Sequence, residues 1–481
     1  MYSKKLRLII VAVGLFLSGT KIIATEQDFK TKIANMITTN LPGATVGVIL
    51  QDARSGKILY DYHGNKHFLP ASTTKLFTAA AALQELGPLY KYETSLYYAL
   101  PNIDHAERSS EVALKFTGDP SFKLVNLQSL LKKLRQAKIK EITGDLLVDD
   151  SIFDGPLLGH GWTWDSAAWY YAAPVSAIII DYNQLGVTLF PTKEIGGTVV
   201  AKLDSNFPGA NTRELKAKLI GVTYQDSETK CQIHAEVDDQ NHVAINGCWP
   251  IGTEQQHLKL AIKNPRLQAK TLILEALKLN KIKLHGKIKF AKVPANLTKL
   301  AHHESEPLYL LLNAILGESN NLYAESLVKT MGARLFGIGS FKTGSLAVQQ
   351  ILTKSTGIDF AQARLHDGSG ASRYNLLTPV QLSRLLYTML HEASIGKYFR
   401  DAMAISGVNG TLQQRFASFD TKASIQAKTG TLAGVSALSG YLTTRSQREL
   451  IVTIMINHAA TDGAALKRFE NELCYFLVNQ V

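Results

Sequence analysis

Cysteine is scarce in this sequence. Only three of the 481 residues are cysteine, which excludes a disulfide framework as the basis of the fold. Cys231 and Cys248 could pair in an oxidising compartment. Cys474 lies in an apolar stretch near the end of the chain, where a buried structural thiol is expected rather than a nucleophile.

Metal-binding and nucleic-acid-binding patterns are also lacking. The histidines at His302-His303-Glu304 and His366-Asp367 have no second ligand pair at a useful spacing, so we interpret them as loop histidines and predict no metal and no other cofactor. The formal net charge is +12, yet no basic block is interleaved with aromatic residues, which disfavours nucleic acid. The charge instead favours anionic envelope polymers, anionic peptide termini and a peripheral association with the envelope.

Long hydrophobic runs are absent except at the start of the chain. Lys4, Lys5 and Arg7 precede an apolar run over 8–17, and small and polar residues follow up to residue 24. This pattern predicts a secretory signal peptide over 1–24, and an uncleaved membrane anchor is the alternative. We therefore expect an exported, periplasmic protein, because no amphipathic anchor follows the last predicted helix.

The pattern of the remaining chain predicts an α+β fold. Hydrophobic residues make up 46% and charged residues 19%, which is typical of a globular protein. The expected strands cover 44–51, 57–62, 427–435, 436–444 and 449–457, and the expected helices cover 73–86, 308–331 and 462–477. Both ends of the chain thus contribute strands to one antiparallel sheet flanked by helices.

The middle of the chain, 92–297, alternates short strands with glycine, aspartate and proline turns, and its most helical piece is 263–280. We interpret it as an insertion of one or two smaller domains between 25–91 and 298–481.

Ser72 and Lys75 form the first candidate catalytic pair. Ser72 precedes the predicted helix 73–86, and a lysine three residues later lies on the same helical face. Serine needs an adjacent base, and burial or a nearby cation such as Lys428 would favour the neutral lysine that can act as one. Alone the pattern is weak, since a helix-capping serine and a solvated lysine would give it too.

Two further motifs strengthen this interpretation. Ser319-Asn320-Asn321 could supply a proton-relay hydroxyl and an amide for a substrate carbonyl, although a polar turn between helices is the alternative. Lys428-Thr429-Gly430 begins a predicted strand, where the lysine adds positive potential, Thr429 can bind a carboxylate and Gly430 permits close approach. The alternative there is an edge-strand lysine. Their order along the chain and their structural contexts are those that serine acyl transfer needs.

A second copy of the last triplet, Lys342-Thr343-Gly344, precedes a helix-like run over 346–352 rather than a strand. We expect it to be a loop in which Ser345 caps the following helix.

With these motifs the sequence resembles the class C low-molecular-mass penicillin-binding proteins, which are serine DD-carboxypeptidases and DD-endopeptidases. The resemblance extends to further segments, which are Gly118-Asp119-Pro120-Ser121, Gly161-Trp162-Thr163-Trp164, Ala173-Pro174, Asp181-Tyr182-Asn183, Asp367-Gly368-Ser369-Gly370, Ser372-Arg373 and 407–412. It implies a penicillin-recognising transpeptidase-like domain with two nested inserted domains.

The resemblance also implies roles for single residues. Ser72 would be acylated by D-Ala-terminated peptidoglycan peptides and by β-lactams, with Lys75 as general base. Ser319 and Asn321 would assist. Lys428 and Thr429 would hold the substrate carboxylate, and Gly430 would let the substrate backbone approach closely. The backbone amides of Ser72 and Thr431 would form the oxyanion hole.

This sequence departs from the family pattern at the expected side-chain specificity site. Ser166 stands where an acidic residue is common, and Asp165 precedes it. Ala433 replaces a frequent glutamine and Thr431 a frequent serine, whereas Arg373 is retained. We expect Arg373 and Asp165 to contact substrate.

Other functions remain open. A β-lactamase or esterase would use the same nucleophile but needs fast deacylation, and a non-catalytic module that binds peptidoglycan would need no nucleophile. Carboxypeptidase and endopeptidase action share one chemistry, so both stay in the prediction.

Overall fold

The computed structural model describes residues 27–101, 106–204, 214–229, 231–416, 419 and 422–480. The predicted signal peptide, 1–24, lies outside these described residues. Within these ranges, no helix combines the length and the apolar character that a membrane span requires.

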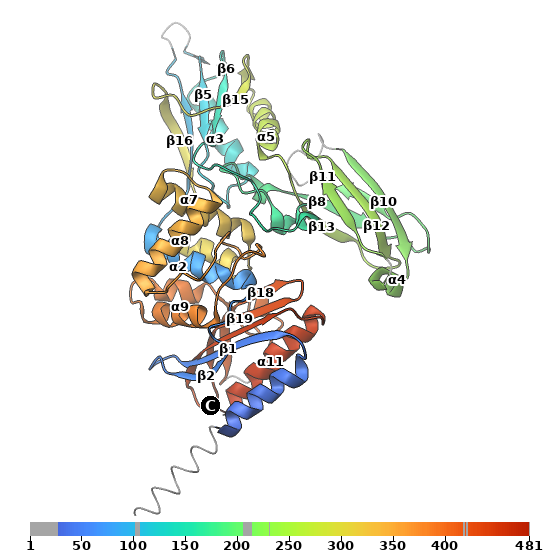
Figure 1. Ribbon diagram of the computed structural model, residues 1–481. Helices are drawn as coiled ribbons and strands as arrows, with labels where there is room; N and C mark the ends of the chain where they lie inside the picture. The colour runs from blue at the N-terminus through green and yellow to red at the C-terminus, as the bar shows by residue number, and fades with distance from the viewer. Residues whose placement is uncertain are drawn as a thin grey trace, which may run out of the picture.

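A six-stranded sheet joins the two ends of the chain (Figure 1). Its order is β17-β18-β19-β20-β1-β2, and every neighbouring pair is antiparallel. The strands are β1 Thr45–Asp52, β2 Ile58–Tyr62, β17 Ala404–Ile405, β18 Ser424–Leu432, β19 Val435–Thr443 and β20 Glu449–Asn457. The predicted α+β architecture, with one antiparallel sheet built from both chain ends, is confirmed.

The central strands are buried on both faces because helices cover both. In β20, Ile451 and Met455 pack into the cluster formed with α2 (Thr74–Leu86) and α9 (Pro379–His391). The alternating residues Val452 and Ile454 pack against α11 (Gly463–Gln480) and the helix over 27–40. Successive side chains of a strand point to opposite faces, so a strand covered on both faces reads as a continuous apolar run.

The helical layer beyond α2 contains the second motif and the second copy of the triplet. Its helices are α6 Leu308–Leu312, the π-helix η7 Asn313–Gly317, α7 Asn321–Phe336, α8 Phe341–Thr356 and α10 Gly396–Asp401. The predicted helix over 308–331 is therefore interrupted before α7. Ser319 adopts a left-handed φ of 65°, and the Asn320 side chain caps α7 by accepting a hydrogen bond from the Tyr323 N–H.

The triplet Lys342-Thr343-Gly344 lies in the first turn of α8. The N-cap of α8 is Ser340, whose side chain accepts a hydrogen bond from the Thr343 N–H. Ser345 is buried inside the helix. The prediction that the triplet forms a loop and that Ser345 caps the following helix is therefore wrong, because α8 begins earlier than its apolar periodicity indicated.

The middle of the chain forms two lobes that extend from the central body (Figure 1). The first lobe contains a five-stranded sheet of order β15-β7-β5-β3-β16, a small sheet of order β14-β6-β4, and two helices. These elements are β3 Glu93–Tyr98, β4 Arg108–Ser109, β5 Val112–Lys115, α3 Leu124–Gln136, β6 Glu141–Ile142, β7 Leu146–Asp149, α5 Pro265–Leu279, β14 Lys283–Leu284, β15 Ile288–Phe290 and β16 Thr298–Glu304. Because β16 pairs with β3, this sheet continues past residue 297, where we drew the domain boundary.

The second lobe is inserted within the first and is built from two three-stranded sheets, of order β13-β8-β9 and β10-β12-β11. Its elements are β8 Gln184–Phe190, β9 Val200–Leu203, β10 Leu215–Val222, α4 Tyr224–Thr229, β11 His234–Val237, β12 Val243–Pro250 and β13 Gln256–Ala261. The division of the chain into domains stays a prediction.

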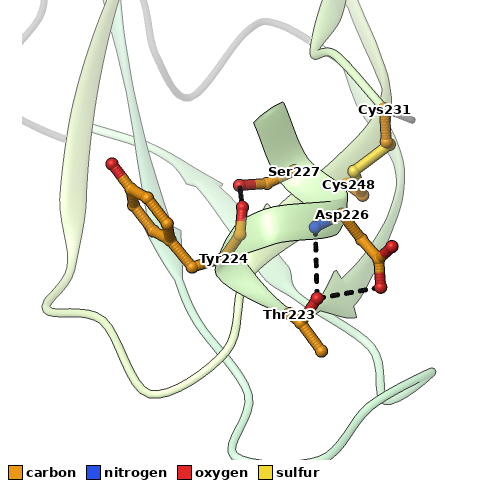
Figure 2. Close-up of a disulfide and its surroundings, with 6 residues drawn as sticks. All are labelled: Thr223, Tyr224, Asp226, Ser227, Cys231 and Cys248. Carbon is orange, nitrogen blue, oxygen red and sulfur yellow. Dashed lines mark hydrogen bonds between the residues drawn. A yellow bond between two sulfur atoms is a disulfide. The ribbon is translucent and has the colours of Figure 1, made fainter. Parts of the chain in front are cut away.

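A disulfide joins Cys231 to Cys248 in the second lobe and ties the segment after α4 to β12 (Figure 2). Thr223 precedes the helix, and its side-chain oxygen accepts a hydrogen bond from the Asp226 N–H (Figure 2). Cys474 is buried in the core between α11 and the sheet, and burial raises the pKa of its thiol to about 12, as an inert cysteine requires.

We expect removal of the disulfide to destabilise the second lobe. The double variant Cys231→Ser/Cys248→Ser should lose about 3 kcal/mol, because the bond closes a 17-residue separation. Thermal unfolding should show a lobe transition that moves to lower temperature in the double variant. Reductant should lower the same transition in the native protein and leave the double variant unchanged; an equal response of both proteins would contradict this.

Candidate active site

Ser72 and Lys75 are brought together by a short 3-10 turn that leads into α2. Ser72 lies in η1 (Ala71–Thr73), and Lys75 follows in the first turn of the helix. Lys75 Nζ lies 2.9 Å from Ser72 Oγ, 2.7 Å from Asn321 Oδ1 and 2.7 Å from the Ser369 carbonyl oxygen. The lysine is fully buried, so these three acceptors replace the water that its amine has lost.

Burial lowers the pKa of Lys75 to about 7. The carboxyl groups of Glu325 and Asp367 act in the opposite direction but do not cancel this effect. A lysine with such a pKa exists partly as the free amine at neutral pH, which is the form that can accept a proton from a serine.

The second motif reaches the same point from the start of α7. The side chain of Asn321 bridges two parts of the site, because Oδ1 accepts from Lys75 and Nδ2 donates to the Tyr171 carbonyl oxygen at 2.8 Å. Ser319 Oγ lies 2.8 Å from Lys428 Nζ. The left-handed backbone of Ser319 turns its side chain out of the helical path; Ala71, beside the nucleophile, also has a positive φ of 46°.

Lys428 is the second fully buried lysine of the site and lies in β18. It donates to Ser319 Oγ and, at 2.7 Å, to the Thr429 carbonyl oxygen. Burial and the nearby amine of Lys75 hold the pKa of Lys428 well below its usual range. Lys75 and Lys428 are therefore a pair of buried amines, and a proton on either one disfavours a proton on the other.

The rest of the third motif forms the edge of β18. Thr429 and Thr431 both line the cleft, as expected for residues two apart in a strand, and Thr429 Oγ1 donates to Thr411 Oγ1 at 2.9 Å. Gly430 lies directly against the nucleophile turn. A Cβ at Gly430 would be 3.0 Å from both the Pro70 carbonyl oxygen and the Ser72 amide nitrogen, so a larger side chain would push the strand away.

The outer edge of β18 is open beside Ser72. In the described chain, β17 pairs only with Gln426 and Ala427, and β19 covers the opposite edge from Ser424 to Leu432. An extended peptide can therefore align along the remainder of β18.

A cleft of about 950 Å³ runs along this edge. Seven predicted site residues line it, which are Ser72, Asp165, Ser319, Asn321, Arg373, Thr429 and Thr431, whereas Lys75, Lys428 and Gly430 lie behind its surface. Arg373 donates from Nη2 to the Ala433 carbonyl oxygen at 3.0 Å, and Asp165 lies in the short helix η3 (Trp164–Ser166). Tyr170, Tyr171, Gln184 and Lys259 extend the cleft wall into the inserted lobes.

Sequence reasoning missed the two acidic residues that organise the segment 367–375. Glu325 is fully buried in α7 and accepts from the backbone N–H groups of Gly368 and Ser369 at 2.9 and 2.7 Å. Asp367 accepts from the Ser372 N–H at 2.6 Å and from Trp162 Nε1 at 2.8 Å. Burial raises the pKa of Glu325 to about 8. The position of Glu325 on α7 gave no signal in the sequence, whereas Asp367 belongs to a segment noted for its family resemblance.

Three cations that line the cleft were also missed, namely Lys259, Arg415 and Lys467. No group of three or more metal-ligating side chains is placed to hold a metal ion in the part of the chain that the structure describes. His302 and His303 lie in β16 and not in a loop, and the ring of His366 packs against Tyr374.

This arrangement defines a serine acyl-transfer site of the penicillin-recognising class. A serine at a helix start lies against a buried lysine of lowered pKa, and both face the open edge of a strand that carries a Lys-Thr-Gly triplet. Comparison with known proteins identifies the particular family. The chain matches the D-Ala-D-Ala carboxypeptidase 3 (S13) family over residues 29–480 and belongs to it.

Individual relatives agree with this assignment. The D-alanyl-D-alanine carboxypeptidase DacB of Haemophilus influenzae is 32% identical, with 98% of each chain covered. A D-alanyl-D-alanine carboxypeptidase of an Actinomadura species is 30% identical over 88% of this chain and 79% of its own. The crystal structure of penicillin binding protein 4 (dacB) from H. influenzae superposes with a TM-score of 0.82, at 30% identity, and covers 93% of this chain and 99% of that one. The crystal structure of the same H. influenzae protein complexed with a β-lactam superposes with a TM-score of 0.79. The predicted family, fold and enzyme class, a serine-type DD-carboxypeptidase, are confirmed.

We expect Gly370→Ala to disturb the nucleophile turn. Gly370 has a φ of 81°, and a Cβ there would lie 1.8 Å from the Ala71 carbonyl oxygen. Gly337→Ala is the matched control, since its φ is 78° but no atom lies within 4 Å of its Cβ position. In denaturant unfolding the control should lose about 1–2 kcal/mol from backbone strain alone. Gly370→Ala should lose at least about twice as much. Equal losses would show that contact with Ala71 is unimportant.

Proposed function

We propose that this protein hydrolyses D-Ala-terminated peptides of peptidoglycan through an acyl-enzyme on Ser72, and that β-lactams acylate the same hydroxyl. The observation that carries the proposal is the 2.9 Å contact between Ser72 Oγ and the buried amine of Lys75. The match to the D-Ala-D-Ala carboxypeptidase family and the two carboxypeptidase relatives support the substrate class.

In the acylation step, the neutral amine of Lys75 accepts the proton of Ser72 while Oγ attacks the carbonyl carbon of the penultimate D-Ala. The pKa of about 7 provides the free amine without making it too weak a base. The carbonyl of Ser369 and the amide of Asn321 hold the amine in place. They also accept hydrogen bonds from the ammonium that forms, which lowers the energy of the charged intermediate.

The tetrahedral oxyanion would be bound by the backbone N–H groups of Ser72 and Thr431. Gly430 allows these two segments to approach closely, since a Cβ at this position would lie only 3.0 Å from the Ser72 amide nitrogen. The start of α2 adds the positive end of a helix dipole. Donors that are already in place when charge develops contribute more than donors that must reorient.

Collapse of the intermediate requires a proton for the leaving amine. Ser319 Oγ is suited to deliver it, because Lys428 Nζ lies 2.8 Å behind that hydroxyl and can replace the proton. Lys428 and Thr429 would orient the terminal carboxylate of the peptide. The proton that Lys75 took from Ser72 has to pass on to Lys428, which then regains the proton it gave up through Ser319 and leaves Lys75 neutral. Water then attacks the ester with the neutral amine of Lys75 as the base, and that proton returns to the Ser72 oxygen as the ester breaks.

The cleft supports both an exopeptidase and an endopeptidase reaction. Its volume of about 950 Å³ exceeds what a D-Ala-D-Ala terminus fills, and its walls extend into the inserted lobes. Arg373 and Asp165 on these walls would contact the peptide side chain that precedes D-Ala. A periplasmic location, after removal of residues 1–24, would give the enzyme access to peptidoglycan.

We expect one covalent adduct per chain when the mature protein is treated with benzylpenicillin, on the peptide that contains Ser72. Ser72→Ala should form none, because no other described hydroxyl lies within hydrogen-bond distance of the Lys75 amine. Intact-mass spectrometry followed by peptide mapping measures this. Release of D-Ala from muropeptide monomers, and cleavage of cross-linked dimers, then separate the two peptidase reactions.

Other outcomes would exclude this function. Absence of an adduct with intact drug would favour a non-catalytic module that binds peptidoglycan. Absence of an adduct with rapidly hydrolysed drug would favour a β-lactamase.

The acylation rate should depend on pH with a midpoint near 7. Lys75 acts as a base only when it is neutral, and burial lowers its pKa to about 7. The rate should therefore fall about tenfold per pH unit below the midpoint and become constant above it. Stopped-flow measurement of benzylpenicillin acylation from pH 5 to 8.5 tests this, because the carboxylate of the drug stays ionised throughout. Circular dichroism over the same range controls for unfolding, and a rate independent of pH would contradict the role of Lys75.

A further inference from the structure

An arginine outside the three motifs lies in the cleft wall next to the threonines of β18. Arg415 lines the cleft together with Thr411, Thr429 and Thr431. The segment that carries Arg415 is held against β18, because Thr429 Oγ1 donates to Thr411 Oγ1 at 2.9 Å. Arg415 follows that contact by four residues.

The guanidinium of Arg415 is fixed by α11. Nη2 donates to Glu470 Oε2 at 2.9 Å, and both Nε and Nη2 donate to Asn471 Oδ1 at 3.0 and 2.7 Å. Nη2 also lies 3.4 Å from the Lys467 carbonyl oxygen. The guanidinium packs over the Phe416 ring, and the side chain is only 11% exposed. A planar group held by several contacts is pre-organised for a ligand.

Glu470 connects this guanidinium to the other threonine of the strand. Glu470 is fully buried, and its Oε1 accepts from Ser436 Oγ at 2.6 Å. Ser436 is the direct partner of Thr431 in the β18–β19 pair. Side chains that face each other across an antiparallel pair are close neighbours. Arg415 is thus connected to Thr431 through Glu470 and Ser436, and to Thr429 through Thr411.

Arg415 keeps the capacity to bind an anion. All of its hydrogen bonds to described residues use Nε and Nη2, so Nη1 has no protein acceptor there. Guanidinium groups stay protonated in proteins and match the geometry of a carboxylate.

Lys428 lies behind the cleft surface and already makes hydrogen bonds within the protein. It is fully buried and already donates to Ser319 Oγ and to the Thr429 carbonyl oxygen. Burial also holds its pKa well below the usual range, so a second cation at the cleft surface would strengthen the recognition of a carboxylate.

We infer that Arg415 is the permanent cation that recognises the C-terminal carboxylate of the peptide, and the corresponding carboxylate of a β-lactam, beside the hydroxyls of Thr429 and Thr431. The inference rests on the proposed function. Glu470 is a positioning residue, which acts by holding Arg415. The site should therefore prefer peptides with a free C-terminal carboxylate over amides and esters of the same peptides.

The test compares a charged probe with its neutral form. Acylation rates are measured with benzylpenicillin and with its methyl ester, for the native protein, Arg415→Gln and Arg415→Lys. We expect Arg415→Gln to slow acylation by the free acid about 10- to 100-fold, the range for a charge-assisted hydrogen bond. The rate with the ester should change less than about threefold. Arg415→Lys should recover part of the preference for the acid, because it restores the charge but not the planar geometry.

Arg400→Gln is the matched control. Arg400 is also paired with a glutamate, Glu449, and packs 4.9 Å from the Tyr441 ring, but it does not line the cleft. This variant should keep both rates.

Two outcomes would overturn the inference alone: an equal slowing with acid and ester in Arg415→Gln, which indicates a structural role, or no slowing with either probe. Failure of the native protein to react with both probes would instead overturn the proposed function and, with it, the inference. The ester rate also shows whether Arg415→Gln is folded.

Discussion

The removal of the Lys75 amine from water is the constraint on which the rest of the site depends. Its three acceptors come from η1, from α7 and from the segment around Ser369, so three distant parts of the chain must meet within about one side-chain length. If one acceptor moved away, a buried donor would be left unsatisfied, which costs about 1–3 kcal/mol. The same burial lowers the pKa that makes the amine a base. Stability and chemistry therefore demand the same geometry.

The surrounding structure accepts unfavourable features to maintain this geometry. Two non-glycine residues, Ala71 and Ser319, have left-handed backbones, and two buried amines, Lys75 and Lys428, lie close together. Glu325 compensates by fixing the backbone around Ser369 from inside α7. Such strain persists only where many contacts determine the conformation, which agrees with the dense packing of α2 against α7 and α8 in one apolar core.

The sequence alone predicted the parts of this structure that depend on local pattern. Ser72 and Lys75 are three residues apart at the start of one helix, and the continuous apolar run of β20 indicates a buried strand whatever lies around it. Groups supplied by distant packing had no such signal. Glu325 is one of several polar residues in α7, and the role of Arg415 depends on its contacts with Glu470 and Asn471 on α11. The start of α8 was misplaced because its first turn carries polar residues and a capping serine, Ser340, instead of an apolar periodicity.

The central sheet is completed by strands from opposite ends of the chain. β1 pairs with β20 along its whole length, and Val48 lies opposite Ile454. Contacts so distant in sequence are slow to form, because the entropy of closing the intervening loop opposes them. A growing chain presents Ser72 long before Lys428, and until β18 docks, the serine lacks the strand that would align a peptide. An incomplete chain therefore carries the nucleophile without the strand beside which a peptide would align.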